Sequence, residues 1–579
     1  MERRSSPLLR LALASALFAV PWVPVVPGIL VGQSAALQGT RVVDLVVTAT
    51  TDVHGRVRGW DYYADTAEGG RGLSRAATIV DSVRTANPGR VLLVDAGDLL
   101  QGNPFTYVAR DGKGAHPVIA AMNAMRYDAV AVGNHEFNYG IPAFERASAQ
   151  AKFPFLAANS RSLDGKKRWS PFTIVVRAGI KVGIIGVTNP GSMVWDAEHL
   201  QGKVAIDDIV PAVRRTVAEA RAAGAQVIVV VAHAGLDGVA SYDTVSTGLG
   251  SENPMATVAK EVPGIDLIVF GHSHRELADT LINGVLLTQP RNWATSVAVA
   301  HLGVRLVDGR ATVTTRHAEV VRATGHGEQA AVAAAANAGH KAARSYSTAV
   351  IGTTTTDWRA DSARVVDTPI MDFVLEVMRK AAGTDLASAA AFSTEARLAK
   401  GNVTVAQLAL LYPYDNTLKG LRISGKQLRE YLEQSARYWQ VTGSQVTPDP
   451  AIPSFNFEMV TGAEYAMDLS KPAGARIAGL KVKGTLVKDS DSFTIALSNY
   501  RAGGAGGYTM LRGAPLIHDK QLEIRQLLID EVTAKTTLKP SDYFTRNWSL
   551  TPDALQQAAA AASIHERPFD ALRPLNHFP

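Results

Sequence analysis

Short runs of apolar residues, each ending in polar residues, recur along the first half of the chain. Such runs, rich in valine and isoleucine, predict buried β-strands. They lie at Val42 to Thr51, Arg90 to Val94, Asp128 to Val132, Lys181 to Gly186, Gln226 to Val231 and Asp266 to Phe270. Stretches of helical period separate them, at Leu73 to Val83, His116 to Met125 and Pro211 to Ala223. The alternation indicates a fold of the α/β (α+β) class.

Five of these strands end in side chains that can bind a metal ion. Asp52 and His54 follow the first strand, and their spacing of two puts both on one face of an extended segment. His272 and His274 repeat that spacing after the last strand. The others are Asp95 and Asp98 after the second strand, Asn134 and His135 in the stretch Gly133 to Gly140 (GNHEFNYG), and His233. Of the two aspartates, one is expected to serve a metal and the other to cap or brace the loop.

Each of these residues has a plainer interpretation when taken singly. A histidine after a strand is most often a satisfied structural residue, and Asp52 with His54 alone reads as an acidic turn. Together, however, they supply about seven oxygen and nitrogen ligands, which is what a site for two divalent ions with one shared carboxylate needs. The set predicts a dinuclear centre. Ligands of these types accept manganese, zinc, cobalt or iron, and availability decides which ion binds.

Composition narrows the class of protein. A chain of 579 residues with 46% apolar and 19% charged residues suits two or three soluble globular domains. The net charge of +6 suits a small anionic substrate but falls short of the footprint that binds nucleic-acid polymers. The chain has no cysteine, which excludes disulfides, thiol catalysis and thiolate ligands. A metal ion must therefore be held by His, Asp, Asn or Glu.

The first 36 residues are expected to be an export signal. The basic start MERRSSPLLR precedes an apolar stretch from Leu11 to Leu30, which three prolines interrupt, and the small residues Ser34 to Ala36 follow it. The alternative is a retained membrane anchor, because the apolar length approaches that of a bilayer span. Nothing else in the chain reads as a membrane span, so the mature protein is expected to be periplasmic or secreted.

The order of motifs DxH, GD, GNHE, H and GHxH resembles that of the metallophosphoesterase (calcineurin-like) superfamily. The second half, with LLYPYDNTLKGLRISGKQLREYLEQSARYW and PSFNFEMVTG, resembles the 5′-nucleotidase C-terminal domain. Asp61 to Asp65 (DYYAD), GNHEFNYG and Asn499 to Gly504 (NYRAGG) look most like the bifunctional 2′,3′-cyclic-nucleotide 2′-phosphodiesterase/3′-nucleotidases. The resemblance covers roughly residues 40 to 525.

This resemblance implies a domain plan. Residues 41–318 would form a four-layer αββα metallophosphoesterase sandwich, and residues 347–525 a C-terminal α/β substrate-binding domain of the 5′-nucleotidase type. The alanine-rich segment 319–346 between them has high helix propensity and reads as a helical linker, or as another surface helix. The resemblance favours a hinge there. Residues 526–579 are expected to be a polar, alanine-rich tail.

The resemblance also implies roles for the strand-end residues. Asp52, His54 and His274 would hold one metal ion, Asn134, His233 and His272 the other, and Asp98 would bridge the two. His135 would face the scissile phosphate and, when protonated, stabilise charge on it or on the leaving oxygen. Glu136 is expected to brace the loop.

Asn138 is a departure from the common form of the motif. The family often has GNHEFD, in which the aspartate orients the histidine, but this chain has Asn138 there. An amide can orient the ring of His135 but cannot stabilise imidazolium by charge, so the pKa of His135 is expected to be lower than with a carboxylate partner. Replacement of Asn138 by aspartate is accordingly expected to raise the upper pH limit of activity.

Substrate binding is expected in the second half. Tyr414 lies in a turn and Tyr500 lies before a glycine-rich loop. The resemblance implies that the two rings stack a nucleobase. By themselves such tyrosines are more often core or rim residues, and Phe455 and Phe457 read as core. Arg397 falls near the position of a phosphate-contacting arginine, in altered surroundings.

The expected activity is hydrolysis of nucleotide phosphoesters by hydroxide that two metal ions activate. The preferred substrates are 2′,3′-cyclic nucleotides, opened to 3′-nucleotides and then hydrolysed to nucleosides. A 5′-nucleotidase or UDP-sugar hydrolase is the nearest alternative. A non-catalytic exported nucleoside-binding protein is the alternative of another class.

Overall fold

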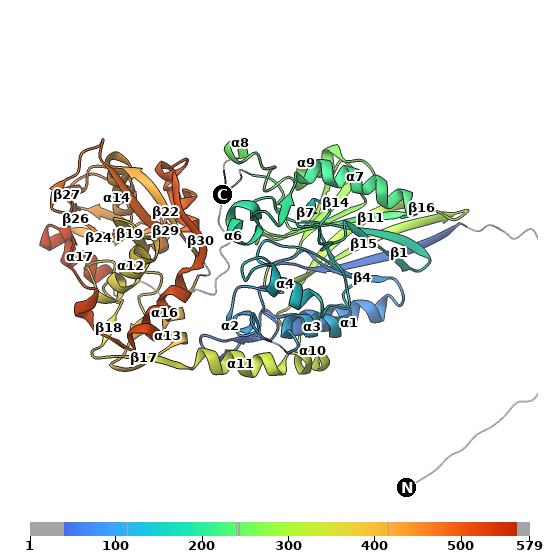
Figure 1. Cartoon of the computed structure of the whole chain (residues 1–579), viewed down its shortest axis with the longest axis horizontal. Helices are drawn as coiled ribbons and strands as arrows, with labels where there is room; N and C mark the ends of the chain where they lie inside the picture. The colour runs from blue at the N-terminus through green and yellow to red at the C-terminus, as the bar shows by residue number, and fades with distance from the viewer. Residues whose placement is uncertain are drawn as a thin grey trace, which may run out of the picture.

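The computed structural model describes residues 40–563 apart from 113, 239, 241, 243 and 415 (Figure 1). The expected export signal at residues 1–36 lies outside the described residues. Within the described part of the chain, no helix is long and apolar enough to cross a membrane.

The N-terminal domain is built on two six-stranded sheets. The first has the order β16-β15-β1-β4-β5-β6 and the second β13-β14-β12-β11-β9-β8. The strands of the first sheet are Arg310–Arg322 (β16), Ser296–Val307 (β15), Arg41–Thr50 (β1), Val91–Asp95 (β4), Ala129–Ala131 (β5) and Phe155–Leu156 (β6). Those of the second are Leu277–Ile282 (β13), Val285–Gln289 (β14), Leu267–Phe270 (β12), Val227–Ala232 (β11), Ile180–Val187 (β9) and Phe172–Arg177 (β8).

Helices cover the outer face of each sheet. The first sheet packs against α1 (Leu73–Ala86), α3 (Pro117–Met125) and α4 (Ile141–Ser148). The second packs against α7 (Ile209–Ala222) and α9 (Met255–Glu261). A third apolar core lies between the two sheets. The predicted four-layer αββα sandwich is therefore confirmed.

Burial on both faces explains the continuous apolar runs of the sequence. In β11, Val227, Val229 and Val231 point into the core between the sheets, whereas Ile228 and Val230 point toward the helices. Alternate residues of one strand thus enter different cores, and no position is left for a polar side chain. The predicted strands and helices match the observed ones to within about three residues at each end, as expected for ends read from sequence.

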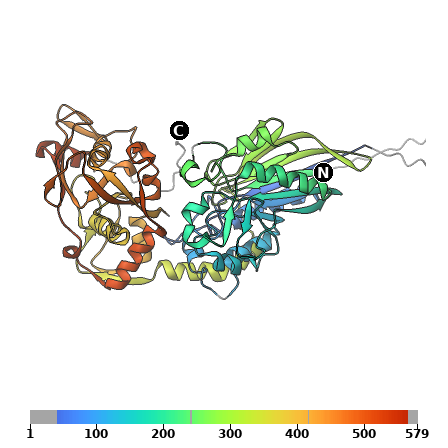
Figure 2. The ribbon, with the colours of Figure 1, turned by 45° about the horizontal axis from the view of Figure 1, so that its top comes forward.

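The linker is two helices. Strand β16 runs to Arg322, so the N-terminal domain continues beyond the expected boundary at 318. Helices α10 (Ala330–Ala335) and α11 (Asn337–Ser347) follow, and both pack against α3. In Figures 1 and 2 these yellow-green helices lie along one side of the N-terminal domain and lead to the second domain.

The C-terminal domain surrounds one large apolar core. Its main sheet has the order β25-β19-β29-β22-β30. The five strands are Glu458–Thr461, Leu386–Ala390, Ser492–Ser498, Thr417–Ser424 and Leu516–Glu523, in that order. Helices α12 (Pro369–Ala382), α14 (Gly425–Ala436) and α16 (Ile524–Lys535) contribute to the core around it.

The C-terminal domain does not end at residue 525. Strand β31 (Thr537–Leu538) pairs with β17 (Val350–Thr354), and β32 (Trp548–Thr551) pairs with β26 (Ala463–Asp468). Helix α17 (Asp553–Ser563) packs against β32. The expected tail therefore belongs to the fold as far as residue 563, because these segments complete sheets begun much earlier in the chain.

The two domains touch beside the carboxyl edge of the first sheet. The Gln101 side chain donates to Glu523 Oε1 at 2.8 Å, and the guanidinium of Arg525 lies 4.8 Å from the centre of the Tyr63 ring. Strand β30 also contacts the short helix α5 (Ser192–Trp195) of the N-terminal domain. These contacts bring the C-terminal domain close to the loops that carry the candidate ligands.

Candidate metal centre

The loops at the carboxyl ends of the parallel strands bring the candidate ligands together. Strands β1, β4 and β5 of one sheet are parallel to each other, as are β9, β11 and β12 of the other. The side chains that follow β1, β4, β5, β11 and β12 therefore meet at one edge of the sandwich. All seven predicted ligands lie there, in two clusters joined by Asp98: Asp52, His54, Asp98, Asn134, His233, His272 and His274.

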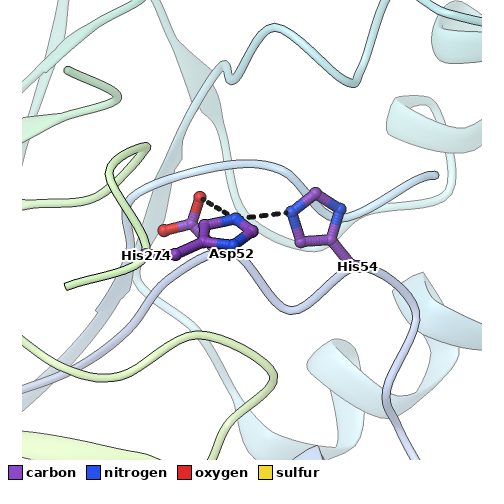
Figure 3. Close-up of side chains that lie close together, drawn as sticks. All are labelled: Asp52, His54 and His274. Carbon is purple, nitrogen blue, oxygen red and sulfur yellow. Dashed lines mark hydrogen bonds and ion pairs between the residues drawn. The ribbon is translucent and has the colours of Figure 1, made fainter. Parts of the chain in front are cut away.

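The first cluster is Asp52, His54 and His274 (Figure 3). The Nε2 atoms of His54 and His274 face one another at 3.1 Å, and His274 Nε2 lies 3.4 Å from Asp52 Oδ1. Two imidazole nitrogens and a carboxylate oxygen so placed offer three ligand atoms to one divalent ion.

The second cluster surrounds Asn134. Its Oδ1 lies 2.9 Å from His233 Nε2 and 3.1 Å from His272 Nδ1. His233 Nε2 is also 3.0 Å from Asp98 Oδ2. An amide oxygen, two imidazole nitrogens and a carboxylate oxygen converge here.

Asp98 lies between the two clusters. Its Oδ2 is 3.0 Å from His233 Nε2 and 3.8 Å from His54 Nε2, which belong to different clusters. Burial opposes ionisation of Asp98, but His233 and His135 outweigh it and hold the pKa of this carboxyl well below its ordinary value. The side chain is thus an anion shared by both halves of the site.

Hydrogen bonds on the far side of the rings select which nitrogen faces the centre. His54 Nδ1 lies 3.0 Å from the Gln101 carbonyl oxygen, and His233 Nδ1 lies 2.8 Å from that of Ala96. A carbonyl can only accept, so Nδ1 carries the hydrogen and Nε2 is free to bind a cation. His272 is turned the other way, because its Nε2 donates to Glu252 Oε1 at 2.8 Å and leaves Nδ1 inward.

The ligand loops hold strained backbone. Five of the seven candidate ligands have a positive φ: Asp52 at 48°, His54 at 47°, Asp98 at 63°, His272 at 71° and His274 at 53°. Few non-glycine residues adopt this region, and those that do concentrate at functional sites. Gly133 permits a close approach of two loops, since a Cβ there would lie 2.7 Å from Glu136 Oε2 and would also collide with Asp98.

Glu136 braces the loops, as its place in the motif predicted. Its carboxylate accepts hydrogen bonds from four backbone N–H groups, those of Asp98 (3.0 Å), Leu99 (2.6 Å), Leu100 (3.3 Å) and Gly133 (2.7 Å). Of the two aspartates at the end of β4 and in the loop beyond it, Asp98 faces the clusters. Asp95 instead accepts from the Gly97 N–H at 2.8 Å and from the Thr50 hydroxyl at 2.5 Å, so it supports the turn.

His135 lies beside the shared carboxylate. Its Nε2 is 3.9 Å from Asp98 Oδ2, and its Nδ1 is 2.5 Å from Asn138 Oδ1. Asn138 in turn donates from Nδ2 to Asp196 Oδ1 at 2.9 Å. Burial lowers the pKa of His135, but Asp98, Asn138 and Asp196 together raise it above the ordinary value. The Asn138 amide therefore connects His135 to the carboxylate of Asp196, which lies one hydrogen bond further from the ring.

Three supporting residues were missed by the sequence reasoning. Asp196 holds Asn138, Glu252 holds His272, and Trp195 stacks on the His272 ring at 5.6 Å between centroids with 22° between the planes. The polar loop TNPGS leads into Trp195 and Asp196, but it carries no recognisable ligand pattern. Only the folded arrangement reveals these contacts.

The predicted base-binding tyrosines lie near each other in the C-terminal domain. Tyr414 packs edge-on against Phe392 at 4.9 Å, and Tyr500 packs edge-on against Phe455 at 6.5 Å. Burial and the neighbouring Tyr500 raise the pKa of Tyr414 to about 12. Both tyrosines are half-buried, whereas Phe455 and Phe457 belong to the core, as predicted.

Arg397 lies on the surface of the C-terminal domain. It is exposed on β20 (Arg397–Leu398), which pairs with β18 (Trp358–Arg359). Its expected contact with phosphate stays a prediction.

The αββα sandwich with imidazole, amide and carboxylate ligands at one edge defines a metallophosphoesterase. Residues 45–276 match the family of calcineurin-like phosphoesterases, and residues 350–513 match the 5′-nucleotidase C-terminal domain. The chain belongs to the calcineurin-like phosphoesterases that carry this second domain, a family of phosphoric ester hydrolases.

Individual relatives extend the match to most of the chain. The 2′,3′-cyclic-nucleotide 2′-phosphodiesterase/3′-nucleotidase of Haemophilus influenzae is 31% identical over 90% of this chain and 89% of that protein. The trifunctional nucleotide phosphoesterase YfkN of Bacillus subtilis is 30% identical over 94% of this chain, which spans only 41% of YfkN. A candidate 5′-nucleotidase of Staphylococcus aureus, crystallised with alpha-ketoglutarate, superposes with a TM-score of 0.67 at 26% identity, over 88% of this chain and 100% of that one.

Proposed function

We propose that this chain hydrolyses nucleotide phosphoesters outside the cytoplasm, opening 2′,3′-cyclic nucleotides to 3′-nucleotides and converting these to nucleosides. The observation that carries the proposal is the position of Asp98. Its Oδ2 lies 3.0 Å from His233 Nε2, 3.8 Å from His54 Nε2 and 3.9 Å from His135 Nε2. A carboxylate between two imidazole groups, with a further histidine beside it, suits a phosphoester held at two cations.

The donor set fits divalent ions of the manganese, zinc, cobalt or iron type. In this proposal Asp52, His54 and His274 hold one ion, Asn134, His233 and His272 hold the other, and Asp98 is shared. Bound ions would supply a water of lowered pKa and positive charge opposite the phosphoryl oxygens. Residues of the chain orient the ester and give a proton to the leaving oxygen.

His135 is the group placed to give that proton. Its Nδ1 is occupied by Asn138 Oδ1 at 2.5 Å, so Nε2 is the atom left to face substrate. When Nε2–H gives its proton to the departing ribose oxygen, the P–O bond breaks without release of a free alkoxide. A proton from bulk water then restores the imidazolium.

The C-terminal domain is proposed to hold the nucleoside part. Tyr414 and Tyr500 offer two half-buried rings, and stacking on an aromatic ring contributes about 1 to 3 kcal/mol per base, whatever the base. Arg397 is the candidate contact for a phosphate oxygen. The names of the H. influenzae and B. subtilis relatives support nucleotides as the substrate class.

The proposed location rests on the first 36 residues, which read as an export signal. Mass spectrometry of the mature N-terminus tests it. A chain that begins near residue 36 supports export with cleavage, and an intact Met1 in a membrane fraction supports a retained anchor.

The activity is tested by metal analysis of the purified protein together with turnover of 2′,3′-cyclic AMP, 3′-AMP and 5′-AMP. We expect close to two divalent ions per chain and cleavage of the first two substrates. Cleavage of 5′-AMP alone would support a 5′-nucleotidase or UDP-sugar hydrolase. A metal-loaded protein that binds adenosine but cleaves none of the three esters would overturn the proposal and support a nucleoside-binding protein.

A further inference from the structure

A chain of hydrogen bonds leads away from the proposed site into the protein. His135 Nδ1 is 2.5 Å from Asn138 Oδ1, and Asn138 Nδ2 is 2.9 Å from Asp196 Oδ1. The three residues come from two loops, one after β5 and one after β9. Their contact is a tertiary arrangement and not a local turn.

The last group, Asp196, favours one orientation of the others. The Asn138 amide presents Nδ2 to Asp196 Oδ1 and Oδ1 to His135, and an ionised Asp196 favours this orientation because a carboxylate can only accept hydrogen bonds. The amide oxygen that faces His135 can only accept. His135 Nδ1 therefore carries a hydrogen, and Nε2 faces the shared carboxylate Asp98, 3.9 Å from its Oδ2.

Asp196 does little else for the fold. It is 1% exposed, and although it stands at the N-cap of the short helix α6 (Ala197–Leu200), its side chain caps no backbone N–H. Its Oδ2 is buried and has no hydrogen-bond partner among the described residues. A carboxyl kept in that position costs free energy of folding, and such groups persist where function requires them.

The charged groups around Asp196 are those of the site and of the second domain. Burial raises the pKa of Asp196 to about 7, while the Asn138 hydrogen bond, His135 and Lys419 favour its ionised form and Asp98 opposes it. Lys419, on β22, is 7% exposed and ion-paired with Asp519 of β30. A cation of the C-terminal domain and His135 thus both act on the charge of Asp196.

We propose that Asp196 is a positioning residue for phosphoester hydrolysis, which acts through Asn138 to fix the ring orientation of His135, with a hydrogen on Nδ1 and with Nε2 toward the site. The inference rests on the proposed function, because it concerns the proton that His135 gives to the leaving oxygen. In that step the Nε2–H bond breaks, an O–H bond forms on the departing ribose oxygen, and its P–O bond breaks while hydroxide forms a new P–O bond. Asp196 keeps its own protonation state throughout.

Two single variants and their combination test the relay. An asparagine at 196 can donate as well as accept. In Asp196→Asn the Asn138 amide can therefore turn and point its NH₂ group at His135. Asn138→Asp puts two carboxylates at about the present 2.9 Å separation, which is unfavourable unless they share a proton, so we expect a loss of activity from it. The double variant Asn138→Asp/Asp196→Asn restores every donor and acceptor in exchanged positions, and we expect it to be more active than either single variant.

Two substrates with different leaving groups distinguish a misplaced acid from general damage to the site. A nucleoside oxygen is a poor leaving group and needs a proton, whereas p-nitrophenolate leaves without one. We expect Asp196→Asn to lower kcat for 3′-AMP by on the order of 10-fold to 100-fold and kcat for p-nitrophenyl phosphate by less than about 3-fold, with little change in KM. In a His135→Ala background, Asp196→Asn should cause no further loss for 3′-AMP.

A second readout does not depend on activity. ¹⁵N NMR of histidine-labelled metal-free protein, with His135 assigned from the His135→Ala spectrum, should show a protonated, hydrogen-bonded Nδ1 of His135 in the parent and a change in that Nδ1 resonance in Asp196→Ala. Metal content and the unfolding temperature are measured for every variant.

Equal loss for both esters at unchanged metal content, or an unchanged His135 spectrum, would overturn the positioning role. If the parent cleaves p-nitrophenyl phosphate but no nucleotide, then the proposed substrate class fails. The ¹⁵N NMR measurement of His135 still tests the hydrogen-bonded relay from Asp196 through Asn138 in that case.

Discussion

Replacement of Glu136 by glutamine tests whether one buried carboxylate holds the loops that carry the candidate ligands Asp98 and Asn134 in place. Oε1 of Glu136 accepts from the N–H groups of Leu99 at 2.6 Å and Leu100 at 3.3 Å. Oε2 accepts from Gly133 at 2.7 Å and Asp98 at 3.0 Å. In glutamine one of these oxygens becomes an NH₂ group, so in either orientation two backbone donors face another donor.

The magnitude follows from those two lost bonds. A buried donor without an acceptor costs about 1 to 3 kcal/mol, so the variant should lose roughly 2 to 6 kcal/mol before the loops relax. We expect a net loss of about 2 to 4 kcal/mol and a fall of about 5 to 10 °C in the unfolding midpoint of the catalytic domain. Because the same N–H groups hold the loops of Asp98 and Asn134, affinity for Mn²⁺ should fall by about 10-fold to 100-fold.

The assay is isothermal titration of metal-free protein with Mn²⁺, together with thermal unfolding. Asp95→Asn is a matched control, because Asp95 is also a buried carboxyl that supports a loop after β4. Asp95 accepts from one backbone N–H, and its other partner is the Thr50 hydroxyl, which can accept from an amide NH₂, so we expect a cost below about 1 kcal/mol. Unchanged Mn²⁺ affinity and midpoint in Glu136→Gln would refute the bracing role.

Three further perturbations have defined outcomes. Asp98→Asn should abolish hydrolysis of 3′-AMP while adenosine binding, measured by equilibrium dialysis, stays within about 3-fold of the parent; full activity would remove the shared-ligand role. Tyr500→Ala should weaken stacking and raise KM for 3′-AMP by about 5-fold to 100-fold with little change in kcat, in steady-state assays. Burial opposes ionisation of Glu328, but hydrogen bonds from Arg58 and Ser74 outweigh it and lower its pKa from 4.5 to about 2. A depressed carboxyl pKa stabilises the folded state above pH 4.5 and loses that effect as the pH falls toward 2. The Glu328 side chain is 25% exposed, so its ionised form contributes about 1 to 2 kcal/mol to the free energy of unfolding after screening. In urea unfolding, the parent and Glu328→Gln should therefore differ by about 1 to 2 kcal/mol at pH 6 and converge near pH 2 to 3.

The strands and the convergence of the candidate metal ligands were predictable because their signals are local. A strand buried on both faces needs an unbroken apolar run, as in β11, where successive residues enter different cores. A ligand at the carboxyl end of such a strand follows it directly in the sequence. Since parallel strands end at one edge, adjacency in the chain was enough to predict convergence in space for Asp52, Asn134 and His233.

The missed parts depend on contacts between distant segments. Strand β31 has two residues and β32 has four, and each is defined by a partner more than 80 residues earlier in the chain. Such short strands leave no periodic pattern, so the end of the C-terminal domain was placed too early. In the linker, alanine favours helix at every position alike and gives no sign of the break near Ala336.

Asn138 and Asp196 illustrate the same limit at the proposed catalytic histidine. From the sequence, an amide in place of the usual aspartate means that His135 lacks a carboxylate. In the fold, Asp196 lies 2.9 Å beyond that amide, so the negative charge is present one hydrogen bond further from the ring. The amide is then needed, because only a group that donates at one end and accepts at the other can join a ring N–H to a carboxylate. An aspartate at 138 would suit His135 but repel Asp196, so the two positions constrain each other, and a change at one is expected to be tolerated only with the matching change at the other.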